Sequence, residues 1–526
     1  MVLRRYTHLF FEGRRREEVE RHKNWAIEKE ERIARPKNWP VIGCQVEASL
    51  NFHRLHDWCH MFFSDQNRTV ELKFFTTRIY LTVDPTNVEY ILKTNFCNYP
   101  KGERTREKLR DLLGDGIFNA DGEIWKKQRR IANAIFSGNK NLKDLSVDSF
   151  RKDSLCLLAT LLTYANTGQP INIQDLLMGM TMDSISRVGF GIQGGGMFTM
   201  RNTFTRAFDR ANAMISRRYV NVWWKVHKGL RLGTEKSLVQ ELDNLNAFTS
   251  QVIAERRDQF NKQSPTPTCC ESPQYKVRGD ILSKLMDIGG GKSTEKDLRD
   301  SIMNFTIAGR DTTAVTMAWF IYNICIHKEV AKSIYEEVNK VIHASLQQSI
   351  VMSSSCDQQP LNKYEQVAYR LTYHSLSRMH YLHAALTETL RLYPAVPRDT
   401  KVALDDDMLP DGTHIRKGDH VAYVPYSMGR MEFIWGKDAL EFKPQRWLKD
   451  GHFSQPSPFK FSSFQAGPRM CIGKDWAYLQ MKMTMALLLY FFEFKLVPGQ
   501  AVQYQMMLVL SIANGLHVTV HDRANI

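Results

Sequence analysis

The chain has 526 residues, 43% of them hydrophobic and 24% charged, which is typical of a globular protein with a large core. Its formal net charge of +15 suits acidic partners or an anionic membrane surface, although solvated helix faces account for most of these charges. The sequence contains no compact nucleic-acid-binding module, no apolar segment of transmembrane length and no zinc-site cysteine spacing, and its nine scattered cysteines indicate reduced thiols.

The first part of the chain changes character at a proline and glycine hinge. Residues 1–35 form a charged arm, and the hinge at 36–43 marks the start of a single domain predicted over 36–526. Amphipathic spacing predicts a helix over 47–63. The β-branched and aromatic residues of 69–83 predict a hairpin.

Helices dominate the rest of the chain. Periodicity predicts helices through most of 121–262, a long apolar helix from about 297 to 327, and another over 374–392. Strand and turn patterns occupy 402–424, and a last hairpin is predicted over 504–520, around Asn-Gly. The fold class is therefore mainly α with a minor β part.

One predicted helix carries two donors on the same face. Trp125 and Arg129 are four residues apart, so their side chains point the same way, and both can donate to a carboxylate. Lys126, Lys127 and Arg130 then project outward, where they can contact an acidic partner. A solvated face is an equally good interpretation of the two lysines.

The middle of the long apolar helix contains Ala308–Thr313. Gly309 costs roughly 1 kcal/mol relative to alanine and leaves room beside the helix. The Thr312 hydroxyl can bond back to the carbonyl of Ala308 and bend the axis, and Asp311 can relay protons. A capping pair inside a helix is the alternative, and this motif alone leaves both interpretations open.

Opposite charges at i and i+3 mark the helix over 374–392. Glu388 and Arg391 have apolar neighbours, which predicts a buried pair that requires further partners. Arg446 is the candidate third member.

The segment Phe464–Gly473 holds the most specific pattern. A thiolate at Cys471 can bind a haem iron, and Arg469 suits a carboxylate such as a haem propionate. Gly467 and Gly473 allow unusual backbone angles and close approach to a flat ring. A helix that begins after Cys471 directs its N-terminal dipole at the sulfur. A buried structural cysteine in a glycine turn is the alternative.

The pattern Phe-x-x-Gly-x-Arg-x-Cys-x-Gly resembles the haem-thiolate loop of the cytochrome P-450 superfamily, and the resemblance spans roughly residues 36–522. It implies that the chain adopts the haem-thiolate fold of that superfamily and binds haem (iron protoporphyrin IX). The roles that it implies are iron ligation by Cys471, contacts with the haem by Phe464, Gly467 and Gly473, propionate binding by Arg469, Trp125 and Arg129, proton delivery by Asp311 and Thr312, and a structural cluster of Glu388, Arg391 and Arg446.

Three segments narrow the resemblance. Residues 112–122, 426–431 and 464–469 look like those of the plant fatty-acid ω-hydroxylases, most of all the long-chain type linked to the pollen and spore wall polymer. This implies ω-hydroxylation of a long-chain fatty acid with O2 and with electrons from NADPH, delivered by the flavoprotein NADPH–cytochrome reductase. The residues that the resemblance places along an acyl channel are Phe118, Phe305, Ala308, Val396 and Leu510, which are otherwise interpreted as core.

Two other functions stay open at this point. A haem-thiolate isomerase or dehydratase acting on lipid hydroperoxides would use no external electrons, and a haem sensor or lipid carrier would have no turnover. The resemblance implies the cytosolic face of the endoplasmic reticulum and an apolar anchor ahead of the hinge. Residues 1–35 are charged instead. We therefore expect either peripheral membrane attachment or an incomplete N-terminus.

Overall fold

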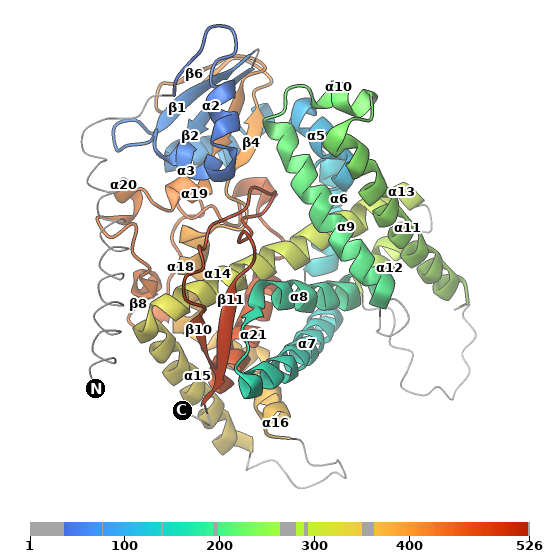
Figure 1. Cartoon of the computed structure of the whole chain (residues 1–526), viewed down its shortest axis with the longest axis vertical. Helices are drawn as coiled ribbons and strands as arrows, with labels where there is room; N and C mark the ends of the chain where they lie inside the picture. The colour runs from blue at the N-terminus through green and yellow to red at the C-terminus, as the bar shows by residue number, and fades with distance from the viewer. Residues whose placement is uncertain are drawn as a thin grey trace.

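The computed structural model describes residues 36–75, 77–137, 140–192, 198–262, 280–288, 293–349 and 362–523. The predicted charged arm at 1–35 lies outside them. A helical body occupies most of the molecule, and a smaller β-rich part lies beside it at the upper left of Figure 1. The predicted class, mainly α with a minor β part, is confirmed.

The elements follow one another along the chain with little strand structure between the helices. The helices are α2 (Gln45–Leu50), α3 (Leu55–His60), α4 (Pro85–Glu89), α5 (Glu103–Leu113), α6 (Gly122–Phe136), α7 (Lys140–Thr167), α8 (Ile173–Phe190), α9 (Phe198–Ser216), α10 (Trp224–Gly229), α11 (Gly233–Lys262), α12 (Ile281–Ile288), α13 (Glu295–Thr306), α14 (Thr312–Ile326), α15 (Lys328–Ser349), α16 (Lys363–Arg370), α17 (Tyr373–Ser377), α18 (His380–Leu392), α19 (Pro425–Met428), α20 (Glu432–Trp435) and α21 (Lys474–Phe491). Short 3-10 turns are η1 (Phe52–Arg54), η3 (Phe96–Asn98), η4 (Arg217–Tyr219), η7 (Pro444–Trp447) and η8 (Gly467–Arg469), and the π-helical turns are η2 (Tyr90–Thr94) and η6 (Ile307–Asp311). The strands are β1 (Thr69–Phe74), β2 (Thr77–Thr82), β3 (Ile171–Asn172), β4 (Asp399–Val402), β5 (Asp407–Met408), β6 (His414–Ile415), β7 (His420–Tyr423), β8 (Leu448–Lys449), β9 (His452–Phe453), β10 (Phe492–Leu496) and β11 (His517–Asp522).

The main sheet joins segments that lie far apart in the sequence. Its strand order is β1-β2-β7-β4. The predicted hairpin over 69–83 is present as β1 and β2, which pair antiparallel. Strand β7 lies parallel to β2, and β4 is antiparallel to β7 at the sheet edge. The β4 edge lies on the side of the sheet toward helices α5 and α9 (Figure 1).

The predicted hairpin over 504–520 is wrong. A turn exists at Asn514 and Gly515, where φ is 61° and 77°. The strand after it, β11, pairs with β10 and β3 instead. The residues before the turn contribute only one isolated bridge, from Tyr504 to Ile512. Strand β10 is the better partner because it offers five paired positions, with buried phenylalanines alternating along it.

Two of the predicted helices, over 47–63 and from about 297 to 327, are interrupted. The predicted helix over 47–63 is split into α2, η1 and α3. The predicted helix near 297–327 is observed as α13, the π turn η6 and α14. In the second case the Thr312 hydroxyl donates to the carbonyl of Ala308 at 2.5 Å, a bond of the kind that bends helices.

Helix α14 crosses the centre of the molecule (Figure 1). Nearly all of its side chains are buried, as expected of a helix that is apolar on every side. It packs against α8, α15, α18 and α21. Helix α21, which follows Cys471, and helix α14, which follows Asp311, therefore belong to one continuous core.

Candidate active site

The loop that ends at Cys471 is closed by backbone hydrogen bonds. The Cys471 N–H donates to the Phe464 carbonyl at 2.9 Å, and the Met470 N–H donates to the Gly467 carbonyl at 3.1 Å. Gly467 has φ of +63°, and a Cβ there would lie 2.0 Å from the carbonyl oxygen of Leu92. Only glycine allows this approach.

Phe464 and Gly473, at the two ends of the loop, have ordinary geometry. The Phe464 ring packs against Tyr478 of α21, with ring centroids 5.3 Å apart. Gly473 has an ordinary φ of −84°, so the expectation of an unusual backbone angle is wrong at this position. A Cβ at Gly473 would lie 4.0 Å from the Cys471 sulfur, which is an ordinary contact.

The Cys471 sulfur combines two properties that are seldom found together. Burial raises the pKa of its thiol, while the Gly473 N–H and the charges of Arg129 and Lys474 lower it. The side chain is nevertheless accessible to solvent. The side chain therefore has room for a ligand, while the protein around it affects the pKa of the thiol.

Cationic donors surround this loop. Arg129 donates to the Met470 carbonyl at 2.6 Å. Arg469 donates to Asp121 Oδ1 at 2.6 Å, and its guanidinium lies 4.5 Å from the centroid of the Trp125 ring. The Arg469 Nε is buried and has no hydrogen-bond partner among the described residues. One charged donor is thus left available beside the loop.

A second polar group lies on η6. Arg310 donates through Nη1 to Asp311 Oδ1 at 2.8 Å and to Asp209 Oδ1 at 2.6 Å. The Asp311 side chain is 2% exposed, whereas that of Asp209 is 45% exposed. Burial raises the pKa of Asp311 to about 7, against the lowering effect of Arg310. A chain of polar groups therefore runs from the surface to a buried carboxyl.

The room expected beside Gly309 is filled. A Cβ at Gly309 would lie 2.8 Å from Cδ1 of Ile185, a residue of α8. The glycine thus allows α8 to pack closely against η6, and the expectation of free space at this point is wrong. Ala308 and Thr312, on the same turn, are only half-buried.

Glu388 is the hub of a buried cluster. It accepts hydrogen bonds from Arg391 Nε at 2.7 Å and from Arg391 Nη2 at 2.8 Å. Arg446 Nε donates to it at 3.4 Å, and the Trp447 indole donates at 2.8 Å. Arg391 also donates to the carbonyls of Gly429 and Ala439. The structure therefore brings together the three residues predicted to form this cluster.

The candidate channel residues differ in exposure. Phe118 is 40% exposed, and Phe305, Ala308 and Val396 are half-buried. Leu510 is 1% exposed. Its N–H donates to the Ala395 carbonyl at 3.0 Å and its carbonyl accepts from the Trp319 indole at 2.7 Å. These bonds fix the backbone of Leu510 within the core, and its place along a channel stays a prediction.

Comparison with known proteins agrees with this geometry. A family model described as "Cytochrome P450" matches residues 34–519. The chain is 47% identical over 499 residues to Cytochrome P450 704B1 of Arabidopsis thaliana, which covers 93% of this chain and 95% of that protein. It is 41% identical over 508 residues to Cytochrome P450 704C1 of Pinus taeda, covering 93% and 94%. It is 36% identical over 502 residues to Cytochrome P450 86B1 of Arabidopsis thaliana, covering 92% and 85%.

The chain belongs to the cytochrome P450 family.

Members of the cytochrome P450 family are monooxygenases that bind haem through a cysteine thiolate. The residues of this chain suit that group. Cys471 offers an accessible side chain; burial raises the pKa of its thiol, and the Gly473 N–H and nearby cations partly offset this. Arg469 offers a buried donor that lacks a partner among the described residues. When bound, the haem supplies the site for dioxygen and the means of its cleavage.

Sequence reasoning missed a charged network behind the loop of this cytochrome P450. Asp399 of β4 accepts from Lys401 at 2.8 Å, Lys101 at 2.9 Å and the Gln465 side chain at 2.8 Å. Lys401 is fully buried. The available signal was two opposite charges at i and i+2 beside a predicted strand, because residues two apart in a strand point to the same face and can pair there.

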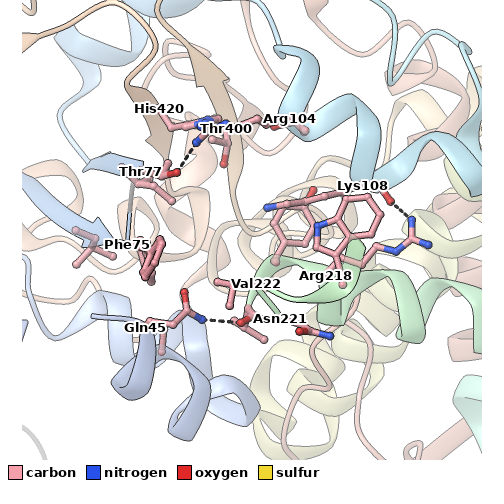
Figure 2. A pocket seen from close by; sticks show the side chains of 18 of the residues that line it. Gln45, Phe75, Thr77, Arg104, Lys108, Arg218, Asn221, Val222, Thr400 and His420 are labelled. Atoms are coloured by element: carbon pink, nitrogen blue, oxygen red, sulfur yellow. Dashed lines mark hydrogen bonds between the residues drawn. The ribbon is translucent and has the colours of Figure 1, made fainter. Parts of the chain in front are cut away.

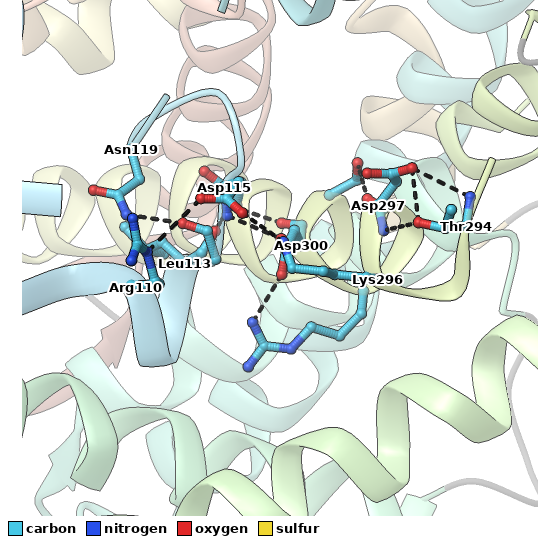
Figure 3. Close-up of polar contacts among 12 residues, drawn as sticks. Arg110, Leu113, Asp115, Asn119, Thr294, Lys296, Asp297 and Asp300 are labelled. Atoms are coloured by element: carbon cyan, nitrogen blue, oxygen red, sulfur yellow. Dashed lines mark hydrogen bonds and ion pairs between the residues drawn. The ribbon is translucent and has the colours of Figure 1, made fainter. Parts of the chain in front are cut away.

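A second missed feature is the anchoring of the segment 114–121 on α13 (Figure 3). The Asp115 N–H donates to Asp300 at 2.9 Å, and Lys296 donates to Asp115 at 2.7 Å. The Phe118 N–H donates to Asn304 at 3.1 Å. A Cβ at Gly116 would lie 2.0 Å from the Asn304 amide nitrogen. The glycine therefore lets the segment approach α13 closely enough to fix Phe118.

Within the residues that the structure describes, no helix has both the length and the apolar character needed to cross a membrane.

Proposed function

We propose that this protein ω-hydroxylates long-chain fatty acids, with electrons that NADPH supplies through a flavoprotein reductase. The observation that carries the proposal is the polar chain Asp209–Arg310–Asp311 beside Thr312, in a member of a monooxygenase family. An isomerase or dehydratase that uses no external electrons has no need of such a chain. The substrate class follows from the three segments that resemble plant fatty-acid ω-hydroxylases.

Each residue has a defined task in this proposal. Cys471 ligates the iron, with its thiolate favoured by Arg129 and the Gly473 N–H. Arg129, Arg469 and Trp125 bind the propionates as donors. Asp311 would hold a proton at its carboxyl oxygen, and the Thr312 hydroxyl would pass it on for the oxygen chemistry that the haem supplies when bound.

Selectivity for the chain end requires shape rather than reactivity. The terminal methyl has the strongest C–H bonds of the acyl chain, so the protein must keep the other carbons away from the site of oxidation. The candidates to line such a channel are Phe118, Phe305, Ala308, Val396 and Leu510. Phe118 is the best placed of them, because its backbone is tied to α13 while its ring remains exposed.

We also propose that the protein contacts the cytosolic face of the endoplasmic reticulum through an apolar surface. Large apolar side chains are exposed on two parts of the chain. The first is the segment 39–50 with the turn at Phe75, whose N–H donates to the Ile42 carbonyl, and its exposed apolar residues are Trp39, Val41, Val46, Leu50 and Phe75. The second is the segment 220–232, with Val222, Trp223, Val226, Leu230 and Leu232. Gln45 of the first segment donates to the Val220 carbonyl of the second at 2.6 Å. Exposed apolar patches of this kind mark contact surfaces.

The membrane proposal is tested with vesicles of phosphatidylcholine and phosphatidylserine. The variant Trp223→Ser should co-sediment less than the parent protein. Ile326→Ser changes an exposed apolar residue on a different helix and serves as the control. Equal losses in the two variants would refute the proposed surface.

The catalytic proposal is tested first by the carbon monoxide difference spectrum of the reduced protein, which reports thiolate-ligated haem. The protein is then incubated with reductase, NADPH and palmitate or oleate, and the products are identified. The expected main product is the ω-hydroxy acid. In-chain products, or turnover of a lipid hydroperoxide without NADPH, would contradict the proposal, and haem binding without NADPH oxidation would indicate a carrier or sensor.

A further inference from the structure

A pocket of about 420 Å³ lies between the main sheet and the helices α5 and α10. Its walls come from α2 and α3, from strands β1, β2, β4 and β7, and from the segment around η4 (Figure 2). Its volume falls in the range of pockets that hold small organic ligands. The cysteine loop does not line it, so it is distinct from the site described above.

Five basic residues line the pocket, and they divide into two groups. Arg218 is neutralised by Glu235 at 2.6 Å and by Asp111 at 2.8 Å, and Lys225 is paired with Glu107 at 2.5 Å. Arg104, Lys108 and Arg398 form no ion pair within the described part of the chain. Three cations in one pocket therefore lack a counter-charge.

The unpaired cations influence one another and their neighbours. Burial and the charges of Arg398 and Arg104 lower the pKa of Lys108 to about 8. Burial and the charges of Lys108 and Arg104 lower the pKa of His420 to about 4. Arg104 and Lys108 are also like charges at i and i+4 on α5, which is unfavourable. An anion between them would relieve each of these effects.

The remaining walls identify the rest of the ligand. Leu55, Trp58, Leu72 and Ile79 line the pocket together with Phe75 and Trp224. A free phosphate would satisfy the cations but would leave these apolar walls in water. A ligand with one anionic group and a long apolar body matches both parts of the lining.

Strand β4 connects this pocket to the cysteine loop. Side chains alternate along a strand, and Arg398 and Thr400 face the pocket. Asp399, between them, faces the other way and accepts from Gln465 of the cysteine loop at 2.8 Å. A ligand held by Arg398 therefore lies on one side of a single strand, with the loop that carries Cys471 on the other.

We propose that Arg104, Lys108 and Arg398 bind the carboxylate of a long-chain fatty acid, and that this anchor holds the far end of the chain in place for oxidation. The inference rests on the proposed function and names the residues that would recognise the acid. Two of the cations come from α5 and one precedes β4, so the carboxylate bridges the helix to the sheet. The other two cations of α5, Arg106 and Arg110, have acidic partners. Arg110, for example, pairs with Glu103 at 2.8 Å.

The test compares the binding of palmitate and of 1-hexadecanol, which has the same chain without the charge. Binding is measured by calorimetry on the haem-loaded protein, for the variants Lys108→Met and Arg398→Gln. We expect each variant to weaken palmitate binding roughly 10- to 100-fold, the range for a hydrogen bond to a charged group, and to change hexadecanol binding by less than about twofold. Arg110→Gln, on the same helix, should change neither.

Two further measurements make the test decisive. Lys108→Arg keeps the charge and should restore the preference for palmitate, and an unchanged carbon monoxide spectrum shows that each variant is folded. The proportion of ω-hydroxy acid among the products of palmitate should fall in Lys108→Met, because the far end of the chain is no longer fixed.

The outcomes distinguish the proposed carboxylate anchor from the proposed ω-hydroxylation. Equal weakening for palmitate and hexadecanol, or no weakening at all, overturns the anchor while ω-hydroxylation by the parent protein stands. Charge-dependent binding of palmitate without turnover supports the anchor and overturns the proposed function. A parent protein that does not bind palmitate overturns both.

Discussion

Arg129 of α6 donates a hydrogen bond of 2.6 Å to the carbonyl of Met470, the residue directly before Cys471. Two segments more than three hundred residues apart are thereby joined next to the sulfur. The charge of Arg129 also lowers the pKa of the Cys471 thiol. The residue thus has both a structural and an electrostatic effect on the loop.

Replacing this arginine should weaken haem binding. In Arg129→Gln the pKa of the Cys471 thiol rises, because a nearby positive charge that lowers it is lost, so a smaller fraction is thiolate at any given pH. The carbon monoxide difference spectrum should show less thiolate-ligated haem than in the parent protein. The control is Arg130→Gln, which alters an exposed neighbour on the same helix. Identical spectra for the two variants would argue against the role of Arg129.

The pKa of Asp311 predicts how coupling depends on pH. Because burial raises this pKa from 3.8 to about 7, the carboxyl carries a proton below pH 7 and loses it above. Product formed per NADPH consumed should therefore fall as the pH rises through about 7. Asp311→Asn should give a low yield at every pH. Asp287→Asn, at an exposed position on α12, should keep the profile of the parent protein.

The same shift has a consequence for stability. The folded chain holds a proton on Asp311 that the unfolded chain releases, so this group favours folding below pH 3.8 and loses that contribution as the pH rises to about 7. Thermal melts of Asp311→Asn across this range should show a weaker decline with pH than those of the parent protein. An identical decline would mean that Asp311 titrates at its ordinary pKa.

The Thr312 hydroxyl is predicted to couple electron flow to product. Thr312→Ala should continue to consume NADPH while releasing hydrogen peroxide in place of much of the hydroxy acid. Thr312→Ser keeps a hydroxyl that can donate to the Ala308 carbonyl and should retain most of the yield. Equal yields from the alanine and serine variants would show that the hydroxyl is not needed.

Removing the charge of Glu388 should destabilise the fold. Glu388→Gln leaves Arg391 as a buried cation without a counter-charge, and both side chains are 0% exposed. Loss of one partner from such a pair costs about 3 to 5 kcal/mol in the free energy of unfolding. Chemical denaturation of the haem-free protein measures it. Lys332→Ala, which breaks an exposed pair with Glu336, should leave the midpoint unchanged.

Much of this arrangement was predictable because its patterns are local. The spacing of Trp125 and Arg129, the pair Glu388 and Arg391, and the loop before Cys471 are each contained in a few neighbouring residues. The link from Arg310 to Asp209 spans 101 residues and the link from Gln465 to Asp399 spans 66, so neither leaves a pattern in a short window. Such pairs are set by packing between helices and strands.

The errors have the same origin. Gly309 was interpreted from its missing side chain, but the space belongs to Ile185 of a helix more than a hundred residues earlier. The prediction of the last hairpin is wrong because β10 pairs with β11 over a longer stretch than the residues before the turn could provide.

Opposite faces of strand β4 contact the pocket and the cysteine loop, so the number of residues before Asp399 matters as much as their identity. The loss or gain of one residue just before Asp399 would turn Asp399 toward the pocket and an uncharged or basic side chain toward Gln465. The contacts on both faces of β4 would be lost together, although none of the residues that make them had been replaced. We therefore expect this stretch to tolerate conservative substitutions better than any insertion or deletion, which a scan of single-residue deletions across 396–402 would reveal as an abrupt loss of haem content.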